Sequence, residues 1–586
     1  MTVFLGFSCS QHDPSVAAVD EDGVVLFAEA NERPLKNKRG WHAPPDAFGV
    51  VDALLDRYAG NGLVDASLTW SRKALASSPY LSRIARLAIS GYERVRPAGR
   101  EADLWRAWTL RHALYRAPTS ADDLLLNLEL RLRQRRGFRE RPVRRAWDHH
   151  LCHGVTACLS SPFDEALCVV MDGMGEGSST SVYRFRGDRL ERLDRPALTN
   201  LASLGQLFSQ ACYAAGFDPE AGEEWKLMGL AAYGSLDEDL YRDLRGALAV
   251  DDGRLRAMRG YAPAMERLLP LRGRGHMANA NLAHTAQKVF EDILMDFLGR
   301  AHQRWGGEHL VLTGGCALNS SAVGKVLRAT PFRHLHVPMA PGDDGNSVGA
   351  ALLGWRAANP GRTPPRFVSP YLGSEISRDA VARLARFGIA PRPVPGGEAG
   401  LAEAVAADLA AGRIVAVARG RAEFGHRALG ARSILADPRE AAMRDRINAS
   451  VKFREEFRPL APSILHEHGP DYFEDYVASP YMERALRWRP GRAPEGVRHR
   501  DGTGRLQSVG PWSDPFLRAV IRSFHAATGV PIVLNTSFNV MGRPMVHDVE
   551  DAVGVFLTSD IDVLVLGDAL FRKEADRPGV PGRGSR

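Results

Sequence analysis

Two histidines near residue 150 and two later aspartates could together bind one metal ion. His149 and His153 are four residues apart, so on a helix both imidazoles leave from the same face. Asp172 ends an apolar run and opens a glycine turn at Gly173, and Asp343 lies in a second glycine turn. Two histidines with one or two carboxylates suit Fe(II), Mn(II) or Zn(II) and leave coordination positions open. The set favours a metal that orients phosphates, although such a histidine pair also arises by chance among 18 histidines.

A second group of residues, in the C-terminal half, could bind anions. Its basic members lie in short segments rich in glycine or interrupted by proline, and not along an amphipathic face. Arginine donates paired hydrogen bonds to a phosphate or carboxylate, so the group favours an anion pocket, although single members could pair with nearby acids. Residues 324–326 read Gly-Lys-Val, so no Walker A motif is present and ATP would need another architecture. The basic residues are Arg427, Lys452, Arg458 and Arg505.

Buried strands that end in glycine turns are expected to position these residues. Two similar units of strand, turn and strand begin at residues 3–7 and 167–171, and the first turn contains His12. A third glycine turn, with Gly314 and Gly315, follows another apolar run. The repetition predicts a duplicated α/β domain whose turns can direct backbone N–H groups at phosphates.

The length of 586 residues exceeds what one hydrophobic core supports, so at least two domains are expected. A proline-rich joint near residue 360 marks the boundary between them. The expected organisation is a first domain over 1–358 with a helical insertion at about 75–145 and a helical block over 200–300, a linker over 359–375, a second α/β domain over 376–574, and a disordered tail over 575–586.

Composition limits the partners and the compartment. The net charge of +7 comes from 76 basic against 69 acidic residues, and the basic stretch 131–145 reads as a solvated helix face, so no nucleic-acid partner is expected. No apolar run reaches the roughly 18 residues of a membrane span, so no span is expected. Residues 1–7 have neither a basic segment nor an apolar segment long enough for an export signal, so export is not expected. The six cysteines lie mostly in apolar segments without a CxxC pair, as in a cytoplasmic protein with reduced thiols.

Seven segments spread in order to about residue 570 resemble the NodU/CmcH family of O-carbamoyltransferases, which includes TobZ-like antibiotic-tailoring enzymes. They are residues 149–153, 170–173, 226–234, 314–319, 427–430, 452–459 and 534–539. The resemblance implies an α/β fold with an N-terminal duplicated ASKHA-type (actin-like ATPase) domain that carries helical insertions, and a C-terminal YrdC-like α/β domain. In that scheme the YrdC-like domain converts carbamoyl phosphate and ATP to carbamoyl adenylate, with release of phosphate and pyrophosphate. The ASKHA-type domain then transfers the carbamoyl group to a hydroxyl, and AMP leaves.

The resemblance also implies roles for individual residues. His12, Arg427 and Lys452 are implied to be catalytic, with His12 a base near the adenylate. The implied metal is usually iron, with Mg²⁺ or Mn²⁺ as alternatives. One departure is His426, where the family usually has proline. The implied metal ligands are His149, His153, Asp172 and Asp343, and the implied substrate and nucleotide contacts are Arg458, Arg505, Asn535, Gly173, Gly314 and Gly315.

The function expected from these features is ATP-dependent O-carbamoylation of a hydroxyl on a secondary metabolite such as a deoxysugar or macrolide. The expected partners are carbamoyl phosphate, ATP and the acceptor, with a homodimer as a possible assembly. Residues 75–145 match no segment of known role and are expected to set the acceptor. Alternatives are a tRNA threonylcarbamoyl-transferase-like enzyme, a non-catalytic nucleotide-binding protein, and a sugar kinase on the same scaffold.

Overall fold

The computed structural model describes residues 2–573 except 10–11, 42, 61, 70–124, 137–141, 176–177, 195–201, 252, 269–274 and 393. Most of the expected insertion at 75–145 and all of the expected tail at 575–586 therefore lie outside the described residues, so neither expectation is tested. Within the described ranges, no helix has both the length and the apolar character that crossing a bilayer requires. All six cysteines are free thiols, as the sequence predicts.

The first sheet has five strands in the order β3-β2-β1-β4-β5. β1 pairs antiparallel with β2, β2 pairs antiparallel with β3, and β4 and β5 continue parallel to β1. The turn between β2 and β3 closes where Asp20 Oδ1 accepts hydrogen bonds from the backbone N–H groups of Asp22 and Val24. Helices α1 (Phe48–Leu54) and α4 (Leu126–Arg136) share its outer core. The strands are β1 (Val3–Ser8), β2 (Ser15–Val19), β3 (Val25–Ala30), β4 (Val64–Thr69) and β5 (Val143–Trp147).

The second sheet repeats this arrangement, with the order β12-β11-β6-β7-β8. Three antiparallel strands, β8, β7 and β6, are followed by β11 and β12, which run parallel to β6. Both sheets thus consist of a three-stranded meander extended by two parallel strands, which confirms the predicted duplicated α/β architecture. The strands are β6 (Glu165–Met171), β7 (Thr180–Arg186), β8 (Arg189–Arg192), β11 (His309–Thr313) and β12 (His334–His336).

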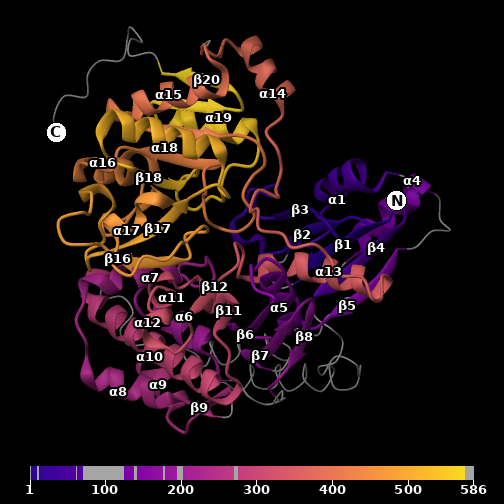
Figure 1. Cartoon of the computed structure of the whole chain (residues 1–586), viewed down its shortest axis with the longest axis vertical. Coiled ribbons are helices and arrows are strands. Elements are labelled where there is room, and N and C mark those ends of the chain that lie inside the picture. The colour runs from indigo at the N-terminus through magenta and orange to yellow at the C-terminus, as the bar shows by residue number, and fades with distance from the viewer. Residues whose placement is uncertain are drawn as a thin grey trace, which may run out of the picture.

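Two helices, α5 (His149–Leu159) and α13 (Asn346–Ala358), pack against each other between the duplicated sheets. α5 contacts β6 and β11, whereas α13 contacts β1 and β4 (Figure 1). Two glycines allow this packing. An added Cβ at Gly349 of α13 would lie 2.1 Å from the backbone oxygen of Cys152 in α5. One at Gly6 of β1 would lie 1.9 Å from the backbone oxygen of Ser347 in α13. The first turn of α5 and the turn before α13 therefore meet in one place.

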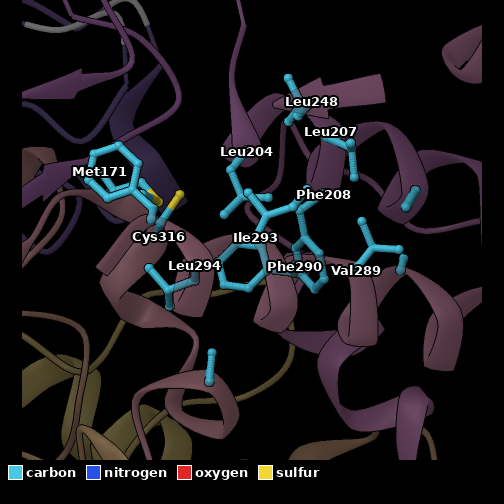
Figure 2. Packing of buried hydrophobic residues seen from close by; sticks show 14 of the residues in the cluster. Met171, Leu204, Leu207, Phe208, Leu248, Val289, Phe290, Ile293, Leu294 and Cys316 are labelled. Atoms are coloured by element: carbon cyan, nitrogen blue, oxygen red, sulfur yellow. The ribbon is translucent and has the colours of Figure 1, made fainter. Parts of the chain in front are cut away.

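Helices cover the far face of the second sheet and form the largest hydrophobic cluster with it. Figure 2 shows Phe208 of α6 beside Phe290 of α10, with ring centroids 5.1 Å apart. Met171 belongs to the same cluster, so this core anchors the end of β6. The predicted helical block over 200–300 consists of α6 (Leu204–Ala214), α7 (Glu224–Leu230), α8 (Glu238–Ala247), α9 (Tyr261–Leu268) and α10 (Ala280–Trp305), interrupted by a hairpin of β9 (Leu248–Asp251) and β10 (Arg254–Ala257).

The C-terminal unit is built on an eight-stranded mixed sheet in the order β16-β17-β15-β18-β14-β13-β19-β20. Val415 and Val417 face α15 and α18, and the alternate residue Ala416 joins the core under α19. Its strands are β13 (Val415–Ala418), β14 (Arg432–Ala436), β15 (Ala461–Leu465), β16 (Arg484–Arg487), β17 (Thr503–Val509), β18 (Ile532–Ser537), β19 (Val563–Leu566) and β20 (Ala569–Arg572). Its helices are α14 (Arg378–Arg383), α15 (Gly397–Ala410), α16 (Ala441–Arg446), α17 (Gly469–Tyr472), α18 (Pro515–Thr528) and α19 (Val549–Thr558).

The C-terminal unit lies directly against the second sheet's helices (Figure 1). β16 packs on α11 (Ser320–Val323), which α12 (Val326–Ala329) follows, and a Cβ added at Gly324 would lie 2.0 Å from the backbone oxygen of Ala485. The glycine turns of the second sheet consequently face loops of the C-terminal unit.

Candidate active site

The four predicted metal ligands converge at the place where α5 and α13 meet. Asp148 caps α5 by accepting a hydrogen bond from the backbone of Leu151, so the helix starts at His149 and places both histidines on one face. Asp172 follows the last residue of β6, and Asp343 begins the single turn η8 (Asp343–Gly345) before α13. The ligand atoms of His149, His153, Asp172 and Asp343 all lie within 4.8 Å of one another, and all four residues are buried.

The donor spacing fits a single cation. His149 Nε2 lies 3.2 Å from His153 Nε2, 3.2 Å from Asp172 Oδ2 and 3.3 Å from Asp343 Oδ1. His153 Nε2 lies 3.7 Å and 3.4 Å from the same two carboxylate oxygens. Metal–ligand bonds of about 2.0–2.2 Å put neighbouring donors roughly 3.0–3.6 Å apart in tetrahedral or octahedral geometry. These nitrogen and oxygen donors therefore suit Fe(II), Mn(II) or Zn(II).

Attraction between the imidazoles and the carboxylates outweighs the cost of burying them. Burial lowers the pKa of His149, but Asp343 and Asp172 together raise it to about 10. Burial raises the pKa of Asp343, but His149 and the other histidines bring it well below its ordinary value. Both carboxylates thus stay negative and draw positive charge into the space between the rings. A divalent cation can replace the protons that this attraction places there.

Surrounding groups orient the two carboxylates. The backbone N–H of Gly315 donates to Asp172 Oδ1 at 3.0 Å, which leaves Oδ2 to face the histidines. Asp343 Oδ2 lies 3.8 Å from Nδ1 of His12, and that nitrogen also lies 2.9 Å from Asp13 Oδ2. The predicted base is therefore adjacent to the cluster, on the side of Asp343 away from the histidines.

The three predicted glycines line the same site. Gly314 has φ +89°, and a Cβ there would lie 2.3 Å from the backbone oxygen of Met171, so only glycine fits. A Cβ at Gly315 would lie 2.9 Å from Asp172 Oδ1. A Cβ at Gly173 would meet no atom of the described residues within 4 Å, so this turn borders open space. The backbone at Gly173 can therefore approach a ligand closely.

Six basic side chains gather where the two halves meet, five of them from the C-terminal unit and one, Lys38, from the first unit. Burial, followed by Arg454 and Arg458, lowers the pKa of Lys452 well below its ordinary value. Burial and then Arg505 do the same to the pKa of Arg427. Like charges that depress each other's pKa in this way attract anions, because an anion relieves their repulsion. The six residues are Lys38, Arg427, Lys452, Arg454, Arg458 and Arg505, and we call them the cation cluster.

Lys452 and Arg458 are among the members of the cation cluster that bond to protein groups. Lys452 Nζ donates to Asn539 Oδ1 at 2.6 Å and to Ser537 Oγ at 3.2 Å. Arg458 donates to Glu455 at 3.0 Å and stacks on Trp225 of α7, with its Cζ 3.8 Å from the ring centroid. Arg458 therefore spans the contact between the C-terminal unit and α7.

One short turn, η7 (Gly315–Leu318), connects the two sites. At its start, Gly315 holds Asp172, and at its end the backbone oxygen of Leu318 accepts a hydrogen bond of 3.3 Å from Arg427 Nη2. His426 lies close enough to Arg427 and Asp13 for both to act on its charge. Burial, then Arg427 and Arg505, lower the pKa of His426 well below its ordinary value.

Asn535 is placed differently from the other predicted contacts. It is fully buried, and its Nδ2 donates to Ala428, Ser463 and Gln507. These bonds place it under the loop that carries Arg427, so its predicted contact with substrate or nucleotide stays a prediction.

Several residues at the two sites carry no role in the sequence interpretation. Arg454 lies between Lys452 and Arg458, and its type and position could have identified it. Lys38 and Trp225 give no such signal, because only the fold brings them to Arg458. Asn346 follows Asp343 by three residues and contacts the far side of His149.

Comparison with known proteins gives matches along most of the chain. The family model described as Carbamoyltransferase N-terminus matches residues 125–352, and the one described as Carbamoyltransferase C-terminus matches residues 406–573. The first range contains the four clustered ligands, and the second contains five members of the cation cluster, all except Lys38.

Curated relatives also match most of the chain. Nodulation protein NolO of Bradyrhizobium diazoefficiens is 35% identical over 73% of this chain and 79% of its own. Nodulation protein U of Rhizobium tropici is 28% identical over 96% of this chain and 95% of its own. The protein sll1178 of Synechocystis is 31% identical over 98% of this chain and 97% of its own.

Proposed function

The chain belongs to the carbamoyltransferase family, and we propose that it transfers a carbamoyl group from carbamoyl phosphate to a hydroxyl through a carbamoyl adenylate made with ATP. The observation that carries this proposal is the pairing of two unlike sites through η7. One site is a buried cluster of two histidines and two aspartates, and the other is the cation cluster. A two-step reaction with an anionic intermediate uses both.

Adenylate formation is assigned to the cation cluster. Carbamoyl phosphate and ATP together bring many negative charges, and basic side chains held in a partly buried site can offset them without reorganising. Arg427 and Lys452 are proposed to stabilise the charge that develops during adenylate formation. Arg458 and Arg505 are proposed to hold the phosphates. In this step carbamoyl phosphate, ATP and water give carbamoyl adenylate, phosphate and pyrophosphate.

Carbamoyl transfer is assigned to the site beside α5 and α13. The acceptor oxygen bonds to the carbamoyl carbon, the bond from that carbon to the AMP phosphate oxygen breaks, and AMP leaves. His12 is proposed to take the hydroxyl proton on Nε2, because Asp13 accepts from Nδ1 at 2.9 Å and so fixes that tautomer. The backbone at Gly173, Gly314 and Gly315 is proposed to face the adenylate phosphate.

The buried cluster is proposed to hold the cofactor metal. His149, His153, Asp172 and Asp343 would be its ligands, with Fe(II) first and Mg(II) or Mn(II) as alternatives. A cation bound there would supply Lewis acidity to the transfer step. The acceptor is proposed to be a hydroxylated secondary metabolite, such as a deoxysugar or macrolide.

Pyrophosphate release from ATP tests the proposal. Purified protein supplied with Fe(II) is expected to release pyrophosphate only when carbamoyl phosphate is added. Release that is independent of carbamoyl phosphate, or no release from folded protein, would contradict the proposed activation step. The second result would favour the tRNA-modifying or binding-only alternatives.

A further inference from the structure

We propose that Asn346 is a positioning residue that holds His149 in the tautomer able to bind a cation, through its carboxamide oxygen and not its nitrogen. This inference rests on the proposed metal site and adds to it the partner that makes one ligand competent. His149 binds a cation through Nε2 only if the proton of the neutral ring is on Nδ1. The group that faces Nδ1 therefore decides whether Nε2 is free to bind.

The geometry places Asn346 at that position. Its Nδ2 lies 3.3 Å from His149 Nδ1, on the opposite side of the ring from Asp172 and Asp343. Asn346 is the first residue of α13 and is 0% exposed, as is His149. Its Oδ1 has no hydrogen-bond partner among the described residues. A buried carboxamide with an unpaired oxygen is unfavourable, because the oxygen has lost the hydrogen bonds that water would supply.

A hydrogen bond from Asn346 Nδ2 to His149 Nδ1 conflicts with metal binding. If Nδ2–H donates to Nδ1, the neutral ring carries its proton on Nε2, where the cluster needs a lone pair. That proton would point into the space between the four donors. The ring could then hydrogen-bond to the carboxylates but could not ligate a cation together with His153.

Rotating the carboxamide by 180° removes both problems. The nitrogen and oxygen of an asparagine side chain have nearly the same shape, so their assignment follows from hydrogen bonding. In the rotated form Oδ1 accepts from Nδ1–H and is no longer unpaired, and the Nε2 lone pair faces the cluster. The close packing of α13 on α5 at Gly349 holds Asn346 at the distance this bond needs.

His153 gives an internal contrast. Its Nδ1 has no hydrogen-bond partner among the described residues, although it is equally buried. Within the described part of the chain, only one of the two imidazole ligands therefore has a protein group at Nδ1 to set its tautomer. Asn346 is accordingly expected to contribute to metal affinity more than a general packing residue would.

Isosteric substitution separates the two orientations. Asp can only accept a hydrogen bond, so Asn346→Asp is expected to bind Co(II), used as the probe, at least as tightly as the unaltered protein. Asn346→Leu keeps the volume but cannot accept a hydrogen bond, so its dissociation constant for Co(II) is expected to be 10–100-fold larger. Asn359 follows the last residue of the same helix, at the end away from the cluster, so Asn359→Leu is the matched control. Calorimetric titration of the full-length apoprotein and the visible Co(II) spectrum give the two readouts.

The results distinguish this inference from the metal site on which it rests. His149→Ala is included to show that binding is at the cluster. If the unaltered protein binds Co(II) and His149→Ala does not, equal affinities for Asn346→Leu and the unaltered protein would overturn the role of Asn346 alone. Weaker binding by Asn346→Asp would show that the carboxamide donates, which also overturns it. No Co(II) binding to the unaltered protein would overturn both the metal site and this inference.

Discussion

At the scale of single residues, the two sites have opposite electrostatic character. Asp172 and Asp343 stay negative beside two histidines, so the buried cluster attracts a cation. Lys452 and Arg427 are close to other bases, so the cation cluster attracts anions. Because the attractions differ in sign, single substitutions are expected to affect the two proposed half-reactions separately.

Lys452→Ala is expected to lower single-turnover pyrophosphate release by about 100-fold or more, since it removes a preorganised positive charge from the activation site. His153→Ala is expected to leave that burst within a few-fold of the unaltered protein while it stops transfer to an acceptor. The measurement is the carbamoyl-phosphate-dependent burst of pyrophosphate in rapid quench, followed by assay of the carbamoylated product.

Two positions outside both sites provide controls for these variants. Lys288 is exposed and pairs with Asp292 on α10, and His468 is half-buried in the C-terminal unit beside Asp471, so Ala at either is expected to leave both steps unchanged. Equal loss of both half-reactions in Lys452→Ala and His153→Ala would contradict the division of roles.

The ligand set could be predicted from sequence, but its supporting residues could not. His149 and His153 share a helix face by spacing alone, and Asp172 directly follows a strand that the apolar run before it predicts. Asn346 and Trp225 act on residues that are 197 and 233 positions away in the chain, and no local pattern encodes such contacts.

At the scale of elements, the contact between α5 and α13 determines the geometry of the buried cluster. α5 carries both histidines, and η8 at the start of α13 carries Asp343. The two helices can approach because Gly349 has no side chain to meet the backbone of Cys152. A substitution at this helix contact is therefore expected to move the metal ligands, although the substituted residue does not touch them.

Gly349→Ala is expected to lower both stability and metal affinity. The added Cβ would lie 2.1 Å from the Cys152 oxygen, so the helices must separate, at a cost of roughly 1–3 kcal/mol. Thermal unfolding of the apoprotein and Co(II) titration measure the two effects.

Gly299→Ala, within α10, is the matched helical control. A Cβ there meets no atom of the described residues within 4 Å, so the change is expected to stabilise the protein by about 0.5–1 kcal/mol and to leave metal affinity unaltered. A Gly349→Ala protein as stable as Gly299→Ala, with full metal affinity, would show that the helix contact does not set the cluster.

The strands of the duplicated sheets could be predicted better than the C-terminal sheet. Apolar runs that end in turns rich in small residues identify β1, β6 and β11, and their recurrence indicates the repeat. In the C-terminal sheet β13 pairs with β19, so residues 415 and 563 are partners. Local patterns predict strands but not such distant partners, since pairing depends on the packing of the whole unit.

At the scale of the whole molecule, a buried carboxylate joins the first sheet to the C-terminal unit. Glu29 of β3 is 4% exposed and accepts from Ser374 Oγ at 2.5 Å. His547, in the loop before α19, lies 3.6 Å from the same carboxylate. Burial raises the pKa of Glu29, but His547, Arg33 and Ser374 together lower it from 4.5 to about 2.

This pKa predicts that the contact between the units weakens in acid. Because the folded-state pKa lies below the unfolded-state value, the carboxylate stabilises the folded protein fully above about pH 4.5 and loses that effect as pH falls toward 2. The difference corresponds to roughly 3 kcal/mol at neutral pH. Glu29→Gln removes the charge and keeps the size, so it is expected to lower the unfolding temperature at pH 7 and to match the unaltered protein increasingly as pH falls from 4.5 to 3.

Calorimetric unfolding of both proteins from pH 7 to pH 3 tests this expectation. Glu495→Gln removes an exposed carboxylate that pairs with Arg498 three residues away, and it is expected to change little at any pH. A constant difference between Glu29→Gln and the unaltered protein across the range would mean that hydrogen bonding, and not charge, accounts for the role of Glu29. A narrowing difference would instead show that the two units, and with them the two proposed sites, are held together partly by the buried Glu29 carboxylate, which acid protonates.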